Sequence, residues 1–265
     1  MIPRHQAIAG GGVLAVGLAL APTRASAQED RQEILVGKHR NYESPQHFAL
    51  ELRFSPFTPD IDSDPNLKDP TTGLPATPYK DTFGSSPRLL LAGEFDWQAA
   101  RIRHVGTFGP AFGFGYSRMS GDAAFAPPRV GISGETTSLN VFPFYVVAVL
   151  RVDALWREVG IPIVPYAKLG AEMALWRASN TLGTSSYSGV SGLGHSVGTQ
   201  VAFGLALNLN VFDDYAARNF DEAAGVNNTY LFADWSRADL DGLWFQKDPL
   251  RVGGAYWTFG LAFEF

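Results

Sequence analysis

The sequence predicts an all-β protein: a single antiparallel, up-and-down transmembrane β-barrel of about eight strands, with one short helix near residues 213–224. Three observations predict this fold. Eight long segments alternate large apolar residues with small or charged ones, the connections between them alternate in length, and the N-terminus has the composition of an export signal. A chain of 265 residues is compatible with one barrel domain.

The N-terminal segment predicts export. Arg4 and His5 precede an apolar stretch over residues 7–21, and Ala25-Ser26-Ala27 follows it. This order of a charged start, an apolar stretch too short to span a membrane and small residues is typical of a cleavable signal peptide. We therefore expect a signal peptide over residues 1–27, a polar periplasmic lead-in over 28–46 and the barrel over 47–265.

Charge and cysteine content exclude several classes of function. The formal net charge is −5, and removal of the signal peptide makes it more negative, which argues against nucleic-acid binding. The chain has no cysteine, so it has no disulfide framework and no thiolate metal site. We expect no cofactor.

The alternation of residue types continues for longer than the roughly 5–6 residues of a typical soluble strand. A membrane-spanning strand needs about 9–11 residues. We expect the large apolar face to meet lipid and the small or charged face to fill the lumen. The eight segments are 47–54, 88–98, 106–117, 139–149, 163–175, 196–210, 228–236 and 256–265.

One segment has apolar residues on both faces, so alternation alone does not fix its orientation. Its large-residue face carries Leu139, Val141, Tyr145, Val147 and Val149. By analogy with the other seven segments, this face is expected to point toward lipid.

The connections give an independent indication of topology, because outer-membrane barrels alternate short periplasmic turns with long outer loops. The predicted outer loops are 55–87, 118–135, 177–195 and 237–249, and the predicted turns are 99–105, 151–162 and 211–227. The last turn is long and contains the predicted periplasmic helix, with Asp213 or Asp214 as N-cap and Gly225 as its end. Ten strands remain possible if residues 28–46 or the first loop contribute a hairpin.

The end of the chain resembles the C-terminal assembly signal of outer-membrane barrels. That pattern is met by Thr258, Gly260, Phe263 and Phe265. The resemblance implies recognition by the barrel-assembly machinery through strand addition. The alternative is an edge strand that ends in phenylalanine by chance.

More broadly, the chain resembles small eight-stranded outer-membrane barrels of the OmpA/OmpX type. It also looks like a myxobacterial family of outer-membrane barrels without an assigned activity. The second likeness is carried by Glu51-Leu52-Arg53-Phe54, Asp62, Pro78-Tyr79, Val164-Pro165-Tyr166-Ala167-Lys168-Leu169-Gly170 and Gly260-Leu261-Ala262-Phe263-Glu264-Phe265. These resemblances imply location in the outer membrane, with lipid and lipopolysaccharide as surroundings.

Strand alternation places nine charged residues on the lumen face. A barrel of eight strands has room only for its own side chains, so these charges must pair. One interpretation is an internal salt-bridge plug. The other is a narrow, weakly cation-preferring path, since six acids face three bases. The predicted residues are Glu51, Arg53, Arg88, Glu94, Asp96, Lys168, Glu172, Asp234 and Glu264.

Aromatic residues near strand ends predict two girdles at the membrane surfaces. Trp97, Tyr116, Trp235 and Trp257, together with Phe265, have this placement. The alternative is a soluble, lipocalin-like periplasmic barrel, in which the faces would be inverted around an apolar ligand cavity.

Two weaker patterns suggest chemistry. Asp60, Asp62 and Asp64 alternate in the first loop and could bind Ca²⁺, but an EF-hand glycine is replaced by Pro65 and a solvated acidic loop is favoured. The adjacent pair His195-Ser196 could belong to a lipid-modifying hydrolase, although no acidic partner lies beside it in the sequence. We therefore expect a non-enzymatic barrel with a structural or surface-recognition role. Ligand and oligomeric state stay open.

Overall fold

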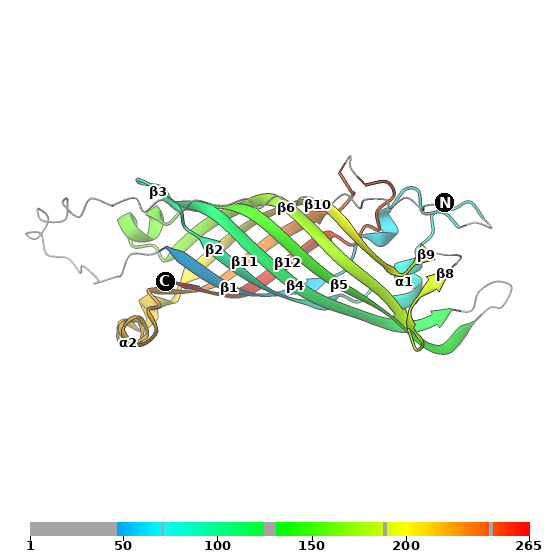
Figure 1. The fold of residues 1–265 in the computed structure, drawn as a ribbon. Helices are drawn as coiled ribbons and strands as arrows, with labels where there is room; N and C mark the ends of the chain where they lie inside the picture. Colours follow the sequence, from blue (N-terminus) through cyan, green and yellow to red (C-terminus); the bar gives the residue numbers. More distant parts are fainter. Residues whose placement is uncertain (1–46, 70–71, 125–130, 188–189, 244–245) are drawn as a thin grey trace, which may run out of the picture. The chain divides into compact units, whose positions relative to one another are not determined.

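The computed structural model describes residues 47–69, 72–124, 131–187, 190–243 and 246–265. The predicted signal peptide and lead-in lie outside these ranges. Eight strands form one closed antiparallel wall, in which each strand pairs with the next and the last pairs with the first (Figure 1). They are β1 (Phe48–Phe57), β2 (Arg88–Trp97), β4 (Gly106–Ala124), β5 (Ile132–Arg151), β6 (Ile163–Asn180), β10 (Leu193–Asn208), β11 (Asn228–Asp239) and β12 (Gly254–Glu264).

This closure confirms the predicted up-and-down barrel of eight wall strands. Two further strands only extend it: β3 (Ala100–Ile102) pairs with β4, and β7 (Gly183–Thr184) pairs with β6. Strands β8 (Ser186–Tyr187) and β9 (Val190–Ser191) form a separate two-stranded sheet in a connection. Across the described ranges, a ten-stranded wall is therefore not formed.

The helices are short and lie in the connections. The predicted helix is present as α2 (Asp214–Ala224): the Asp213 carboxylate accepts from the backbone N–H groups of Tyr215 and Ala216, and Gly225 ends it with φ 69°. The others are α1 (Pro78–Phe83), the 3₁₀ turns Ile61–Ser63 and Leu209–Phe212, and a π-helical turn, Leu155–Val159. In the part of the chain that is described, every helix is too short or too polar to cross a membrane.

Two predicted outer loops are largely strand. Strand β4 has 19 residues and β5 has 20, and their pairing continues through Met119–Leu139 and Asp122–Thr136. Strands β6 and β10 likewise extend into the predicted loop 177–195. The hydrogen-bond ladder needs no large apolar side chains, so these strands continue after the apolar alternation has ended.

Side chains along the wall alternate between outward and inward positions, and in β1 every second residue is buried. The face predicted for lipid points outward in seven of the eight segments. Because successive side chains in a strand point to opposite faces, a single register sets the environment of the whole strand.

The predicted orientation of β5 is wrong. Its residues Leu139, Val141, Tyr145, Val147 and Val149 are buried in the lumen, and the outward residues are Phe142, Phe144 and Val146. The reason lies in the paired strand β4. Tyr145, Val147 and Val149 pair with the small inward residues Gly113, Ala111 and Gly109, which leave space inside the barrel for larger neighbours.

Candidate functional site: a filled lumen inside an apolar wall

The outer surface of the wall is a continuous belt of large apolar side chains, which we call the apolar belt. Their exposed fractions run from 39 % for Met173 to 65 % for Phe114. Soluble monomers seldom expose contiguous apolar patches beyond a few hundred Å². All eight wall strands contribute to the belt: Leu50, Leu52, Leu91, Phe95, Phe112, Phe114, Phe144, Val146, Leu169, Met173, Phe203, Leu205, Leu231, Trp257 and Phe259.

The four predicted girdle residues lie on this outer surface. Trp97 is at the end of β2 near the C-terminus, opposite Phe48, whereas Trp235 pairs with Trp257 toward the other end of the wall. Tyr116 packs against Phe142 and donates a hydrogen bond of 3.0 Å to Asn140. Their arrangement at two levels fits the predicted girdles, and their role at a lipid headgroup stays a prediction.

The middle of the lumen holds a network of buried ion pairs centred on Glu51. Its carboxylate accepts from Arg53 Nη1 at 2.5 Å, from Arg151 Nη2 at 2.5 Å and from Lys168 Nζ at 2.8 Å. Lys168 also donates to Glu94 at 2.6 Å. Each of these five charged side chains belongs to a residue with at most 4 % of its surface exposed. Charge-assisted hydrogen bonds of this length are the strong class.

The network extends from Glu51 to strands on the other sides of the barrel. Arg53 donates to Asp234 on β11 at 2.7 Å, and Arg151 Nε donates to Asp96 on β2 at 2.9 Å. Two tyrosines complete it: Tyr145 donates to Glu94 at 2.9 Å and Tyr166 donates to Asp234 at 2.8 Å. Side chains from β1, β2, β5, β6 and β11 therefore meet across the lumen.

The sequence pattern does not identify three members of the network. Arg151 falls in a predicted periplasmic turn, and Tyr145 falls on the face predicted for lipid. Tyr166 falls on the predicted lumen face but is uncharged, so it is not among the predicted network residues. Arg151 continues the inward alternation of Val147 and Val149, so it becomes predictable once the register of β5 is known.

Three of the nine predicted lumen charges lie apart from the network. Arg88 is half-buried and donates to the carbonyl of Phe83 at 3.1 Å. Glu264 accepts from the neutral donors Gln98, Asn228 and Tyr230. Glu172 is 6 % exposed, and its Oε2 has no hydrogen-bond partner among the described residues. Each therefore has a different electrostatic environment.

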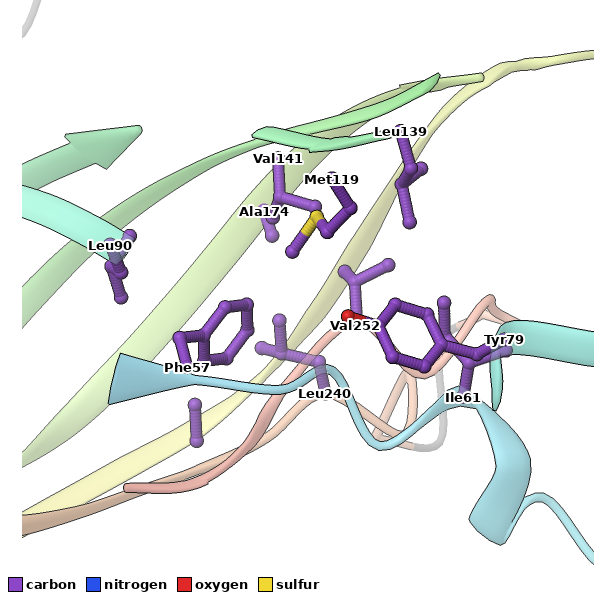
Figure 2. Packing of buried hydrophobic residues seen from close by; sticks show 11 residues of the cluster. Phe57, Ile61, Tyr79, Leu90, Met119, Leu139, Val141, Ala174, Leu240 and Val252 are labelled. Atoms are coloured by element: carbon purple, nitrogen blue, oxygen red, sulfur yellow. The ribbon is translucent and has the colours of Figure 1, made fainter. Parts of the chain in front are cut away.

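An apolar cluster fills the barrel end farthest from the C-terminus, and we call it the cap cluster. Figure 2 shows Ile61 and Tyr79 from the first long connection packed near Leu240 and Val252 from the last. Burial raises the pKa of the Tyr79 phenol above its ordinary value. The cluster is completed by Phe57, Leu90, Met119, Leu139, Val141, Ala174 and Ala238. Long connections thus fold into the mouth and close it.

The acidic residues of the first loop have structural partners. The Asp62 carboxylate accepts from the backbone N–H groups of Tyr79 and Lys80 at 2.8 and 2.9 Å, which holds the start of α1. Asp64 accepts from the backbone of Asn66. Within the described ranges, no three His, Cys, Asp or Glu side chains gather as a metal site would require. The weaker alternative, a Ca²⁺ site at Asp60, Asp62 and Asp64, gains no support from this arrangement.

His195 and Ser196 are not brought together as a catalytic pair. They are successive residues of β10, so His195 is exposed and Ser196 is buried on the opposite face. The Ser196 hydroxyl donates to the carbonyl of Leu250 at 2.6 Å and accepts from Trp176 Nε1 at 3.3 Å. This serine is part of the packing around the cap cluster.

The residues of the predicted assembly signal form the closing strand. Thr258 is buried, and Phe263 and Phe265 belong to the outward alternation. A Cβ atom at Gly260 would overlap the Leu52 carbonyl oxygen and the Phe232 ring, so this position requires glycine for steric reasons. Recognition by an assembly machinery stays a prediction.

Comparisons with known proteins give likenesses of fold only. No protein-family model and no curated protein matches the chain. The attachment invasion locus protein Ail of Yersinia pestis is 12 % identical over 84 % of this chain and 99 % of its own, with a TM-score of 0.40. Neisserial surface protein A is 15 % identical over 83 % and 97 %, with a TM-score of 0.39.

The N-terminal β-barrel domain of Pseudomonas aeruginosa OprF is 10 % identical over 83 % of this chain and 98 % of its own, with a TM-score of 0.37. Sequence identities and TM-scores this low support no inference about function. The eight-stranded closure implied by the OmpA/OmpX-type resemblance rests on the strand pairing of this chain. The myxobacterial likeness stays a prediction.

Proposed function

We propose that the chain is an integral outer-membrane protein of a Gram-negative bacterium, with a structural or surface-recognition role. One observation carries the proposal: the apolar belt is continuous around all eight wall strands, while the ionised side chains lie inside. This arrangement is the inverse of a soluble barrel, and a closed wall with apolar side chains outward supports a location in lipid.

The dimensions of the wall support the same proposal. Strands β1 and β2 each have ten residues. Ten residues rise roughly 33 Å along a strand, and a tilt of about 40° reduces this to roughly 25 Å across the membrane. That height is the typical height of the apolar band of outer-membrane barrels.

The filled lumen supports a structural role over transport. The network around Glu51 spans the middle of the barrel, and the cap cluster closes one mouth. We propose that the wall presents its long connections, including α1 and the extended β4–β5 hairpin, at the cell surface. Loops held above a rigid barrel are suited to contacts with other molecules.

The test is fractionation and gel mobility of the full chain expressed in a Gram-negative host. We expect the protein in the outer-membrane fraction, and we expect unboiled protein to migrate differently from boiled protein because a closed barrel resists the detergent. Recovery as a soluble periplasmic protein without detergent would overturn the proposal and favour the inverted, lipocalin-like barrel.

A narrow, weakly cation-preferring pore is the second candidate, and the excess of acid in the lumen favours it. Six buried acids face the three buried bases Arg53, Arg151 and Lys168. Purified protein in planar bilayers separates the two functions. Reproducible, cation-selective conductance steps would establish the pore, whereas the closed lumen predicts a silent bilayer.

A further inference from the structure

Helix α2 lies against the outside of the barrel wall. The ring of Phe220 packs edge-on against the ring of Phe263 with centroids 6.3 Å apart. Phe263 belongs to the outward face of β12, because its neighbours Ala262 and Glu264 are buried in the lumen. Figure 1 places α2 beside the end of the barrel that carries the C-terminus.

One face of α2 is apolar and is left exposed by the described residues. Ala216, Phe220 and Ala223 follow a spacing of four and three residues, which places them on one side of a helix. All three are exposed, with Phe220 at 42 %, and the preceding turn adds Phe212 at 73 %. Glu222 lies on the opposite side, so the helix is amphipathic.

Beside this contact, a groove of about 590 Å³ lies between the helix, the 3₁₀ turn and the start of β11. Its residues come from the 3₁₀ turn, from the N-cap and body of α2 and from β11. The apolar ones are Leu209, Ala216, Ala217 and Phe220, and the polar ones are Asn210, Asp213, Asn219 and Thr229. The volume falls within the roughly 300–1,000 Å³ of sites that hold small organic ligands. The groove is therefore large enough for part of a lipid.

The groove is continuous with the apolar belt. Phe263, which contacts Phe220, pairs across β12 and β1 with the belt residue Leu50, and it pairs across β11 with Thr229 in the groove. Phe220 thus lies next to the end of the apolar belt that is near the C-terminus, where Leu50 is located. A phospholipid that meets the belt at this level also meets the apolar face of α2.

We infer that α2 is an interfacial helix, and that the groove beneath it binds an acyl chain of a phospholipid in the periplasmic leaflet. This inference rests on the proposed function, because it needs the belt to be in lipid. Burial among acyl chains removes Ala216, Phe220 and Phe212 from water, while Glu222 on the opposite side of the helix stays at headgroup level.

Spin labels on single cysteines test the inference in phospholipid bilayers, and the native chain offers a clean background because it contains no cysteine. Labels at Phe220→Cys and Ala216→Cys probe the apolar face. Glu222→Cys is the matched control on the opposite face of the helix, and Phe259→Cys is the control in the belt. The readout is the ratio of collision rates with oxygen, which concentrates in lipid, to those with a water-soluble nickel complex.

We expect the oxygen-to-nickel ratio at positions 216 and 220 to rise toward the value at 259 and to exceed the value at 222. Equal, low ratios at 216, 220 and 222, with a high ratio at 259, would overturn the interfacial helix and leave the membrane barrel intact. A low ratio at 259 would instead refute the barrel in lipid. Protection of 220 from both reagents would show that a protein covers the helix, which also contradicts the inference.

Discussion

Replacement of Glu51 by glutamine tests whether the buried ion network stabilises the barrel. Glu51 accepts from Arg53, Arg151 and Lys168 in the lumen, and it has no exposed surface. Glutamine keeps the shape of the side chain and removes the charge. The chain provides a matched control in Glu172, which is also buried but has a carboxyl oxygen without a partner among the described residues.

The expected size of the effect follows from what each carboxylate contacts. A hydrogen bond to a charged group contributes about 1.5–3 kcal/mol, although such contributions do not add within one network. Removal of one partner from a buried ion pair costs about 3–5 kcal/mol, because the remaining charges stay buried. We therefore expect Glu51→Gln to lower the free energy of unfolding by about 3–5 kcal/mol.

Glu172→Gln changes a carboxyl that takes part in no ion pair in the described structure. No cation is hydrogen-bonded to this carboxyl in the described structure, so its replacement by glutamine breaks no ion pair and leaves no buried charge without a partner. We expect a change within about 1 kcal/mol, or a gain in stability. The measurement is reversible urea unfolding of both variants and the parent in phospholipid vesicles. Equal losses for the two variants would refute the assignment of the network to Glu51.

Other substitutions test the belt, the cap cluster and the closing strand. Leu52→Arg, in the middle of the belt, should lower the free energy of unfolding in vesicles by about 2–4 kcal/mol. The control Leu74→Arg, in a connection, should change it by less than about 0.5 kcal/mol. Similar losses for the two variants would contradict a lipid-facing wall. Met119→Ala should lower the free energy of unfolding by about 2–5 kcal/mol in the same assay, because Met119 is fully buried in the cap cluster. An unchanged free energy of unfolding would show that the cluster is not packed. Gly260→Ala should reduce the yield of heat-modifiable barrel, while Gly134→Ala, where a Cβ meets open space, should not; equal yields would exclude the steric role of Gly260.

The orientation of most strands was predictable because one face is clearly larger than the other. In β12, for example, Trp257, Phe259 and Leu261 alternate with Thr258 and Gly260, so a single register satisfies both lipid and lumen. No such contrast exists in β5, where both faces are apolar. Its orientation depends on the small inward residues of β4, which is information from a paired strand and not from β5 itself.

The composition of the lumen network was predictable in part. Six of its charged residues follow from strand alternation, but Arg151 lies where the apolar pattern ends, and its placement required the register of β5. The cap cluster was not predicted, because Ile61 and Tyr79 are isolated apolar residues in a polar connection. Their burial depends on how the connections fold into the mouth, and no local periodicity encodes that contact.

The most direct test of the membrane barrel is a set of eight spin-labelled variants, one for each wall strand, in phospholipid bilayers. Cysteine replaces one outward residue at a time at Leu52, Leu91, Phe114, Phe144, Leu169, Phe203, Leu231 and Phe259. The structure predicts that all eight labels collide more with oxygen than with a water-soluble nickel complex. Water exposure of these labels, on one side of the barrel or on all sides, would contradict a closed wall surrounded by lipid.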